Sequence, residues 1–167
     1  MPRPDRRTAS ASRTLSHLGR DGRARMVDVS EKPVSVREAV ARGRIVIAPA
    51  AMRLVRAGRL AKGAVVEVAR LAGILAAKRT ADTVPLCHPL PLTHVDVDLR
   101  PRRDGFLIEA RVRTEARTGA EMEALHAVSV AALTVYDMVK AADKAMRIEA
   151  VRVVRKTGGR SGSYRAR

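Results

Sequence analysis

The segment A-A-K-R-T-A-D-T-V-P-L-C-H-P-L-P-L-T-H, from Ala76 to His94, places reactive side chains in a stiff stretch of backbone. It holds the single cysteine, Cys87, followed directly by His88. Its three prolines fix φ and remove backbone donors, so we expect neither a helix nor a central strand here. Such a loop loses little entropy on ordering, which suits an imidazole that must stay in one place. The alternative is a rigid apolar connection in which His88 satisfies a buried hydrogen bond.

Lysine is rare in this chain although basic residues are common. Of the 33 Lys and Arg residues only six are Lys, namely Lys32, Lys62, Lys78, Lys140, Lys144 and Lys156. Arg stays charged at any useful pH, whereas burial can shift a Lys toward neutrality so that it transfers a proton. Lys62 precedes an expected helix, and Lys140 lies in Y-D-M-V-K on a largely apolar one. Chance survival on a solvated face accounts for Lys32 and Lys144, but it fits Lys140 less well.

A long helix, expected from about Gly119 to Ala142, carries the most unusual pattern. One apolar stripe holds Leu125, Val128, Ala132, Val135 and Val139, and a second holds Met122, His126, Val130, Leu133, Asp137 and Lys140. A helix that is apolar nearly all round must be covered on several sides. One small sheet cannot do this, so we predict that a partner subunit covers part of it. Asp137 and Lys140 would then meet on a half-buried face, either as a proton-transfer pair or as an ion pair that anchors the helix end.

Other charged groups could recognise an anionic ligand. Glu121 and Glu123 open the long helix, where acidic residues suit the helix dipole and can also accept hydrogen bonds from a guanine-like N–H edge. The sequence T-G-G-R-S-G near the C-terminus is similar to a phosphate-cradling turn, with Lys156 and Arg160 beside its backbone N–H groups. It lacks the G-K-[ST] of a P-loop, so ATP hydrolysis of that kind is not expected.

Length and composition limit the class of protein. A chain of 167 residues fits one domain with a proper core, which must be aliphatic because there is no Trp, one Phe and two Tyr. A single cysteine excludes an internal disulfide framework and a Cys-rich zinc site. No apolar run approaches the ~20 residues of a membrane span, and no hydrophobic signal region opens the chain. We therefore expect a cytoplasmic protein.

The net charge of +16 is concentrated at the two ends of the chain. Residues 1–25 hold seven Arg and two Asp, and residues 144–167 hold eight Lys and Arg and one Glu. Basic ends can bind a polyanion without specificity or supply phosphate-binding arms to a small-molecule site. No aromatic stacking platform or nucleic-acid-binding motif accompanies them. A basic nucleic-acid-binding or scaffold protein is therefore the alternative interpretation, and nucleic acid is not the expected partner.

The elements that must position these groups follow from periodicity. We expect helices over residues 36–42, 49–57 and 64–78, strands over 44–48, 95–100, 106–112 and 146–153, and an R-R-D-G hairpin turn. Residues 1–14 are predicted to be a flexible basic arm. Residues 15–167 are predicted to be one catalytic domain with a glycine-rich basic tail. This order indicates an α+β sandwich, in which helices pack on one face of a mostly antiparallel sheet.

Seven motifs occur in order along the chain. They are M-V-D-V-S-E-K (26–32), K-G (62–63), A-G-I-L-A-A-K-R-T (72–80), V-P-L-C-H-P-L (84–90), T-G-A-E-M-E-A-L (118–125), V-A-A-L-T-V-Y-D-M-V-K-A (130–141) and K-T-G-G-R-S-G (156–162). Over about residues 15–164 the chain closely resembles the molybdenum-cofactor biosynthesis protein C family, the cyclic pyranopterin monophosphate synthases. The M-E-A-L and L-C-H-P-L pieces are the most specific.

The resemblance implies a lyase. Such enzymes open the imidazole ring of (8S)-3′,8-cyclo-7,8-dihydroguanosine 5′-triphosphate, rebuild it as a pyranopterin, and close a cyclic phosphate with release of pyrophosphate. The resemblance also implies a ferredoxin-like α+β fold and a homo-hexamer, a trimer of dimers with active sites at subunit interfaces. No cofactor is required by this interpretation, although Mg²⁺ can accompany the triphosphate.

The resemblance also assigns residues to the site. The family's catalytic residues fall on Lys62, Asp137, Lys140 and His88. Its substrate-binding positions fall on Glu121, Met122, Glu123, Cys87 and Lys78, and our candidates for the phosphates add Arg79, Lys156 and Arg160. This chain departs from the usual pattern at Arg160, where Lys is common, at His126, where a small polar residue is common, and at Ala64, where an acid is common.

A metal-dependent hydrolase is the lower alternative. It would use Cys87, His88, His94 and His126 as ligands. Their spacings match no compact ligand set, so no metal residues are assigned.

Overall fold

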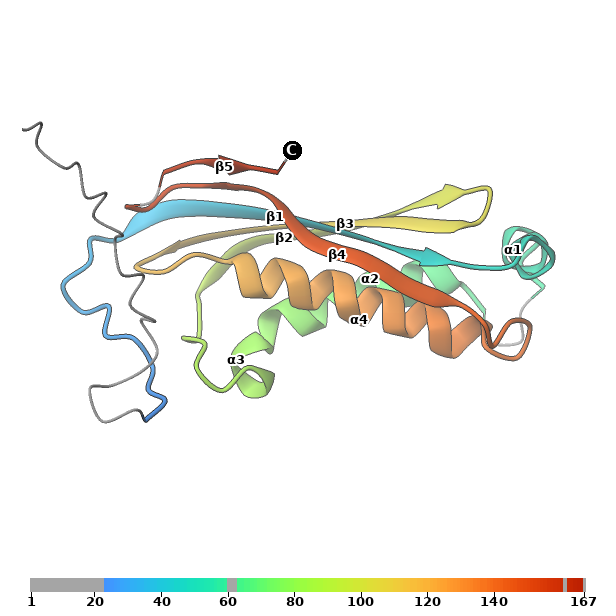
Figure 1. Cartoon of the computed structure of the whole chain (residues 1–167), viewed down its shortest axis with the longest axis horizontal. Helices are drawn as coiled ribbons and strands as arrows, with labels where there is room; N and C mark the ends of the chain where they lie inside the picture. Colours follow the sequence, from blue (N-terminus) through green and yellow to red (C-terminus); the bar gives the residue numbers. More distant parts are fainter. Residues whose placement is uncertain (1–22, 60–62, 161, 167) are drawn as a thin grey trace, which may run out of the picture.

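The computed structural model describes residues 23–59, 63–160 and 162–166 (Figure 1). The elements in chain order are β1 (Ser35–Val46), α1 (Pro49–Arg56), α2 (Val65–Lys78), α3 (Thr80–Thr83), β2 (Leu92–Arg102), β3 (Gly105–Ala116), α4 (Glu121–Val139), β4 (Arg147–Thr157) and β5 (Tyr164–Arg165). Residues 1–14, the predicted arm, lie outside the described residues.

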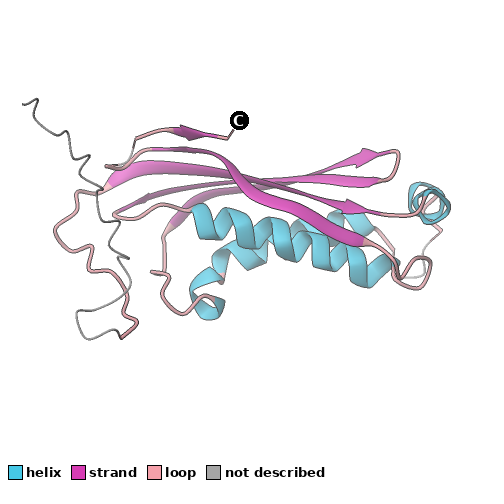
Figure 2. Ribbon diagram, in the orientation of Figure 1, coloured by secondary structure: helices cyan, strands magenta, loops and turns pink. Residues whose placement is uncertain are grey.

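The five strands form one antiparallel sheet in the order β2-β3-β1-β4-β5. Helices α2 and α4 lie together on one face of this sheet, whereas α1 lies at one end beside the β2–β3 hairpin (Figure 2). The first four strands and the helices α2 and α4 alternate as β-α-β-β-α-β, which is the ferredoxin-like arrangement. The predicted α+β sandwich with helices on one face is therefore confirmed.

Small side chains allow the two layers to approach closely. Ala39 and Ala41 of β1 and Ala127 and Ala131 of α4 all belong to one buried core. Gly73 lies where α2 meets α4, and a Cβ at this position would be 2.9 Å from the Ala127 carbonyl oxygen. The abundance of Ala in this sequence therefore produces a thin, tightly packed interface between helices and sheet.

Substituting Gly73 by Ala is expected to lower the free energy of unfolding by about 1–3 kcal/mol because of this overpacking. In an exposed helix the same substitution would stabilise by about 1 kcal/mol, so the sign of the effect is informative. Urea-induced unfolding measures it. Glu67→Ala, on the exposed side of the same helix, is the control and should change stability by less than about 0.5 kcal/mol. A Gly73→Ala protein as stable as the parent would mean that α2 and α4 lie further apart.

The prediction of a helix over residues 36–42 is wrong. These residues form the middle of β1, and the expected strand at 44–48 is only the C-terminal end of the same twelve-residue strand. Ala39, Ala41 and Gly43 alternate on the core side, and Gly43 does not end a helix. Instead, a Cβ there would be 2.8 Å from Val128 of α4. Pairing with β3 and β4 on both sides makes β1 a central strand.

The segment from Ala76 to His94 is partly helical, which corrects a second prediction. Residues Thr80–Thr83 form one helical turn, α3, before the first proline is reached. The Thr80 hydroxyl is buried and donates hydrogen bonds to the carbonyl oxygens of Ala76 and Ala77. These bonds connect the end of α2 to this turn. Residues 84–91 are the irregular proline loop, and the chain then enters β2, an edge strand. The tail also returns as β5 to pair with β4, a strand that we did not predict.

Helix α4 is the core helix of the domain. Of its first predicted stripe, Val128, Ala132, Val135 and Val139 are buried, and Leu125 is partly buried against the same core. Among the described helices it is long and apolar enough to cross a membrane by length and composition, but 50% of that window is buried inside the domain. The second stripe faces outward, and Leu133 is 57% exposed.

Candidate active site

The first group of predicted site residues surrounds the N-terminus of α4. A hollow of about 350 Å³ is lined by Val84, Leu86, Cys87, His88, Leu90, Thr118, Gly119, Glu121, Met122 and Glu123. The proline loop supplies one wall and the first turn of α4 supplies the other. The fold therefore brings together His88, Cys87 and all three residues of E-M-E.

Glu123 is the most unusual group in this hollow. The residue is 3% exposed, and its Oε2 atom has no hydrogen-bond partner among the described residues. Burial raises the pKa of Glu123 to about 7; its own backbone N–H opposes this rise and the charge of Glu121 adds to it. A carboxyl group with this pKa exists in both protonation states near neutral pH, so it can donate or accept a hydrogen bond.

Glu123 is expected to make stability depend on pH. Its folded-state pKa of about 7 exceeds the model-compound value of 4.5, so the folded protein binds more protons than the unfolded chain between these values. Stability therefore falls as pH rises through this window, by up to about 1.4 kcal/mol per pH unit, and does not recover above it. The test is urea unfolding of Glu123→Gln and of the parent at two pH values. The free energy of unfolding of the variant minus that of the parent should be more positive at about pH 8 than at about pH 5. Equal differences at both pH values would contradict this assignment.

Cys87 is half-buried in the same hollow and is not suited to be a nucleophile. Burial raises the pKa of its thiol, and the charge of Glu123 raises it further. The neutral thiol is a weak nucleophile, because reactivity requires the thiolate. Cys87 is therefore a candidate wall residue for a bound ligand.

A second, smaller hollow lies next to the first. It measures about 170 Å³ and is lined by Arg37, Glu38, Gly119, Glu121, Lys156, Thr157 and Gly158. Lys156 Nζ donates to Glu121 Oε1 at 2.8 Å, so a residue predicted to bind phosphate is paired with one predicted to bind the guanine-like ring. Gly158 and Gly159 have φ of +88° and +75°, a conformation that favours glycine. The phosphate-cradling role of this turn stays a prediction.

Two residues beside these hollows were not among the predicted site residues. Arg37 lines the second hollow, with its Nε donating to the Ala116 carbonyl oxygen at 3.0 Å. Asp28 Oδ1 accepts hydrogen bonds from the Ser30 hydroxyl and backbone N–H, which lower the pKa of Asp28, and the charge of His88 lowers it further. Asp28 belongs to the M-V-D-V-S-E-K motif, which could have indicated it. Arg37 was obscured by the helix wrongly expected there.

Several predicted phosphate ligands do not line either hollow. Lys78 and Arg79 are exposed at the end of α2, and Arg160 is exposed in the tail. His126 lies 11 residues before Asp137 on α4, about 16 Å along the helix axis. Its Nδ1 shares a hydrogen bond with the Thr80 hydroxyl at 3.2 Å. This contact ties α4 to α3.

The second group of predicted site residues lies at the opposite end of α4. Lys140 Nζ donates to Asp137 Oδ1 at 2.7 Å, and the two side chains are 53% and 55% exposed. The half-buried face expected for this pair depends on a covering partner subunit and stays a prediction. The hydrogen bond and charge of Asp137 raise the pKa of Lys140, so the amine is held protonated. Lys62, the other catalytic candidate, lies outside the described residues.

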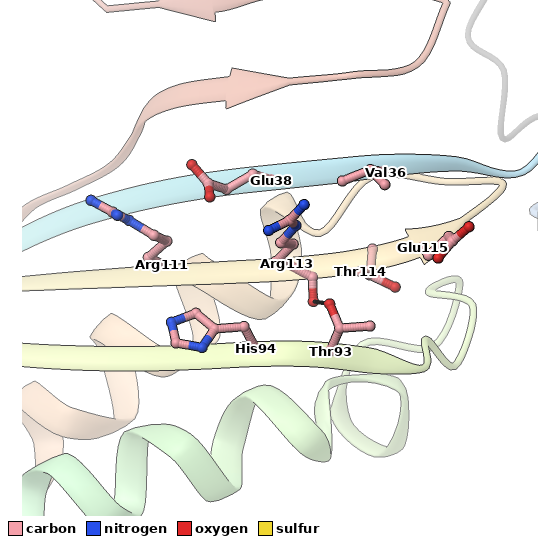
Figure 3. A pocket seen from close by; sticks show the side chains of 8 residues that line it. All are labelled: Val36, Glu38, Thr93, His94, Arg111, Arg113, Thr114 and Glu115. Carbon is pink, nitrogen blue, oxygen red and sulfur yellow. Dashed lines mark hydrogen bonds between the residues drawn. The ribbon is translucent and has the colours of Figure 1, made fainter.

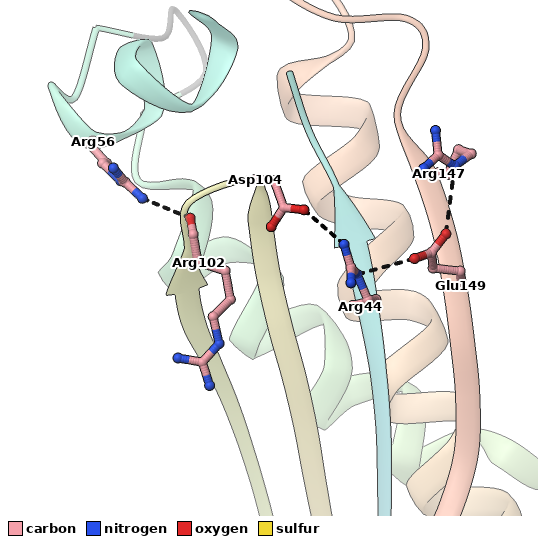
Figure 4. Close-up of polar contacts among 6 residues, drawn as sticks. All are labelled: Arg44, Arg56, Arg102, Asp104, Arg147 and Glu149. Carbon is pink, nitrogen blue, oxygen red and sulfur yellow. Dashed lines mark hydrogen bonds and ion pairs between the residues drawn. The ribbon is translucent and has the colours of Figure 1, made fainter. Parts of the chain in front are cut away.

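Polar contacts tie this end of the molecule together. Arg44 of β1 contacts Asp104 at 2.9 Å and Glu149 at 3.2 Å, and Arg56 of α1 donates to the carbonyl oxygen of Arg102 at 2.7 Å (Figure 4). The backbone N–H of Ala48 donates to Asp143 Oδ2 at 2.8 Å, which joins the start of α1 to the loop after α4. The Asp137–Lys140 pair is therefore presented on a well-connected end of the domain.

One chain cannot bring the two groups of residues together. Glu121 and Asp137 lie on the same helix, 16 residues apart, which separates them by about 24 Å along its axis. The hollow at the N-terminus of α4 therefore lacks the predicted lysine–aspartate pair.

The remaining histidine of the metal alternative lies elsewhere. His94 borders a hollow of about 510 Å³ on the sheet face opposite the helices, beside Arg111 and Arg113 (Figure 3). Within the described parts of the chain, no three His, Cys, Asp or Glu residues are grouped so that they could hold a metal ion. The four residues proposed for a hydrolase therefore do not form a ligand set.

The sequence matches the MoaC family over residues 26–159. The chain belongs to the MoaC family. This match includes both groups of site residues and both hollows, and Arg160 lies just beyond it.

Relatives in the MoaC family match over nearly their whole length. Cyclic pyranopterin monophosphate synthase of Thermomicrobium roseum is 61% identical over 153 residues, covering 90% of this chain and 92% of the relative. The enzyme of the same name from Parvibaculum lavamentivorans is 55% identical over 159 residues, covering 94% and 99%. That of Chloroflexus aggregans is 57% identical over 152 residues, covering 90% and 92%.

Proposed function

We propose that this protein is a cyclic pyranopterin monophosphate synthase of molybdenum cofactor biosynthesis. It converts (8S)-3′,8-cyclo-7,8-dihydroguanosine 5′-triphosphate to cyclic pyranopterin monophosphate and releases pyrophosphate. The main support for this proposal is the match to the MoaC family together with 54–61% identity to synthases over almost the whole chain. The paired hollows support it, because one offers carboxylates and the other offers cations.

The guanine-derived ring is proposed to bind in the larger hollow. Glu121 and Glu123 accept its N–H groups, and Glu123 can also donate because its pKa is about 7. Met122 and Cys87 form apolar walls of the same hollow. His88, held in the proline loop, transfers protons as the imidazole ring is opened and the pterin is closed.

The phosphates are proposed to bind on the basic side of the site. Lys156 lines the smaller hollow, together with Arg37, and can stabilise charge on the α-phosphate and the departing pyrophosphate. Lys78, Arg79 and Arg160 are exposed and do not line this hollow. They are proposed to contact the solvent-facing part of the same triphosphate. Mg²⁺ can accompany the triphosphate, held by the phosphate oxygens.

The complete site is proposed to form between two copies of the chain. Asp137 and Lys140 of one subunit would face the hollow of its partner, since they lie far from the hollow of their own chain. Lys62 is proposed to act in the same composite site. The outer side of α2 and α4 supports such an interface, because Val68, Leu71, Leu75 and Leu133 are exposed there. We propose a hexamer, a trimer of dimers, in the cytoplasm. Residues 15–167 form its catalytic domain and residues 1–14 a basic arm.

Turnover of the 3′,8-cyclised GTP derivative tests this function. Purified protein should release pyrophosphate and form the cyclic pterin, and Lys62→Ala should abolish both. A folded, oligomeric protein without activity would refute the proposal. Salt-sensitive binding to nucleic acid that survives Lys62→Ala would then favour the basic binding protein instead.

A further inference from the structure

Glu121 is shared by the two hollows at the N-terminus of α4. It lines the larger hollow with His88 and Glu123, and the smaller one with Lys156 and Gly158. The Glu121–Lys156 ion pair joins α4 to β4 and lies where the two hollows meet. Its side chains are 26% and 29% exposed, so the pair is only partly accessible to water.

We propose that the Glu121–Lys156 ion pair couples the two hollows, so that an anion bound in one strengthens the binding of a guanine-like ring in the other. This inference rests on the proposed function, which assigns the ring to the larger hollow and the phosphates to the smaller. In the empty site the two charges neutralise each other. In the occupied site, phosphate oxygens replace Glu121 beside Lys156, and ring N–H groups replace Lys156 beside Glu121.

The coupling follows from the requirement that partly buried charges be paired. A ring that binds alone must displace Lys156 from Glu121 Oε1 to form two N–H···O bonds, and it leaves the ammonium group without its partner. An anion that binds alone leaves the carboxylate without its partner in the same way. When both bind, the ion pair is broken once and each charge has a new partner. Each ligand must therefore improve the affinity of the other by the same factor.

The local backbone favours this exchange of partners. A Cβ at Gly119 would lie 2.0 Å from Glu121 Oε2, so glycine lets the carboxylate approach the main chain. Glu121 also lies in the first turn of α4, where the helix dipole stabilises its charge when Lys156 moves away. The carboxylate can therefore stay in place while the flexible lysine side chain turns toward the anion.

Calorimetric titration of the purified full-length oligomer tests the coupling. Guanosine is titrated with and without saturating pyrophosphate, and pyrophosphate with and without saturating guanosine. Pyrophosphate should lower the Kd of guanosine about five- to twentyfold, and guanosine should lower the Kd of pyrophosphate by the same factor. In Lys156→Gln, guanosine should bind without pyrophosphate about as tightly as it binds the parent with pyrophosphate, and added pyrophosphate should have no further effect.

A matched control breaks another ion pair outside both hollows. Arg42→Gln removes the Arg42–Glu109 contact between β1 and β3 and should leave the coupling unchanged. Independent binding of the two ligands to the parent, or equal coupling in Lys156→Gln, would overturn the inference. Absence of guanosine binding would also overturn it. Turnover measured on the same preparation distinguishes failure of the coupling from failure of the proposed function. An active enzyme without coupling contradicts only the coupling, whereas an inactive enzyme without coupling contradicts both.

Discussion

Lys140→Arg is expected to lower kcat by about 10²- to 10⁴-fold, the contribution of a positioned acid or base. Arg preserves the positive charge and the contact with Asp137, so the helix end and the fold should be retained. The guanidinium cannot release a proton at a usable pH, whereas the ammonium of Lys140 can, even with its pKa raised by Asp137. The measurement is kcat for formation of the cyclic pterin, with oligomeric state checked by light scattering.

Lys144→Arg provides the matched control for this substitution. Lys144 lies four residues further along the chain, is exposed, and uses its backbone carbonyl oxygen to accept a bond from Tyr136. Its replacement should leave kcat unchanged. Normal turnover by Lys140→Arg would show that Lys140 supplies only charge, and the argument from the scarcity of lysine would then be wrong.

Mixing two inactive variants is expected to restore turnover if the active site combines two chains. His88→Ala damages the hollow at the N-terminus of α4, and Lys140→Ala damages the pair at its other end. In randomly mixed dimers, each site takes one group of residues from each chain, so about one site in four is intact. Co-expressed or co-refolded variants should therefore recover about a quarter of parental turnover, whereas each variant alone is nearly inactive.

A second mixture makes this result specific. His88→Ala and Glu121→Ala both damage the same hollow, so mixing them should restore nothing. If mixed oligomers of His88→Ala and Lys140→Ala form, as shown by differential tags, and remain inactive, the composite site is refuted. Recovery in both mixtures would instead indicate that the variants stabilise each other's fold.

Local patterns in the sequence predicted the parts of the fold that depend on neighbouring residues. The apolar repeats of α2 and α4 identified both helices to within two or three residues, and Val95 to Val112 identified the β2–β3 hairpin. Four members of the first stripe of α4 also share one buried face, because a period of 3.6 residues determines which side chains share a helix face. Even the separation of Glu121 from Asp137 was calculable, since the rise of a helix is constant.

The region around β1 shows where local patterns were insufficient. Ala39, Val40, Ala41 and Gly43 are compatible with both a helical and an alternating pattern, and a glycine at the end favours a helix stop. Hydrogen bonds to β3 and β4, whose paired residues lie at least 65 positions further along the chain than these four, decided for a strand. Arg37, a candidate ligand in the smaller hollow, was missed for the same reason.

By itself, the sequence determined the family, the residue types available for proton transfer, and the two long helices. Only the tertiary structure decided that Glu123 is buried without a partner for Oε2, that Glu121 pairs with Lys156, and that Lys140 is exposed in the single chain. These features depend on strand register and on the packing of α4 against the sheet. Because burial and charge pairing arise from residues far apart in sequence, no local pattern contains them.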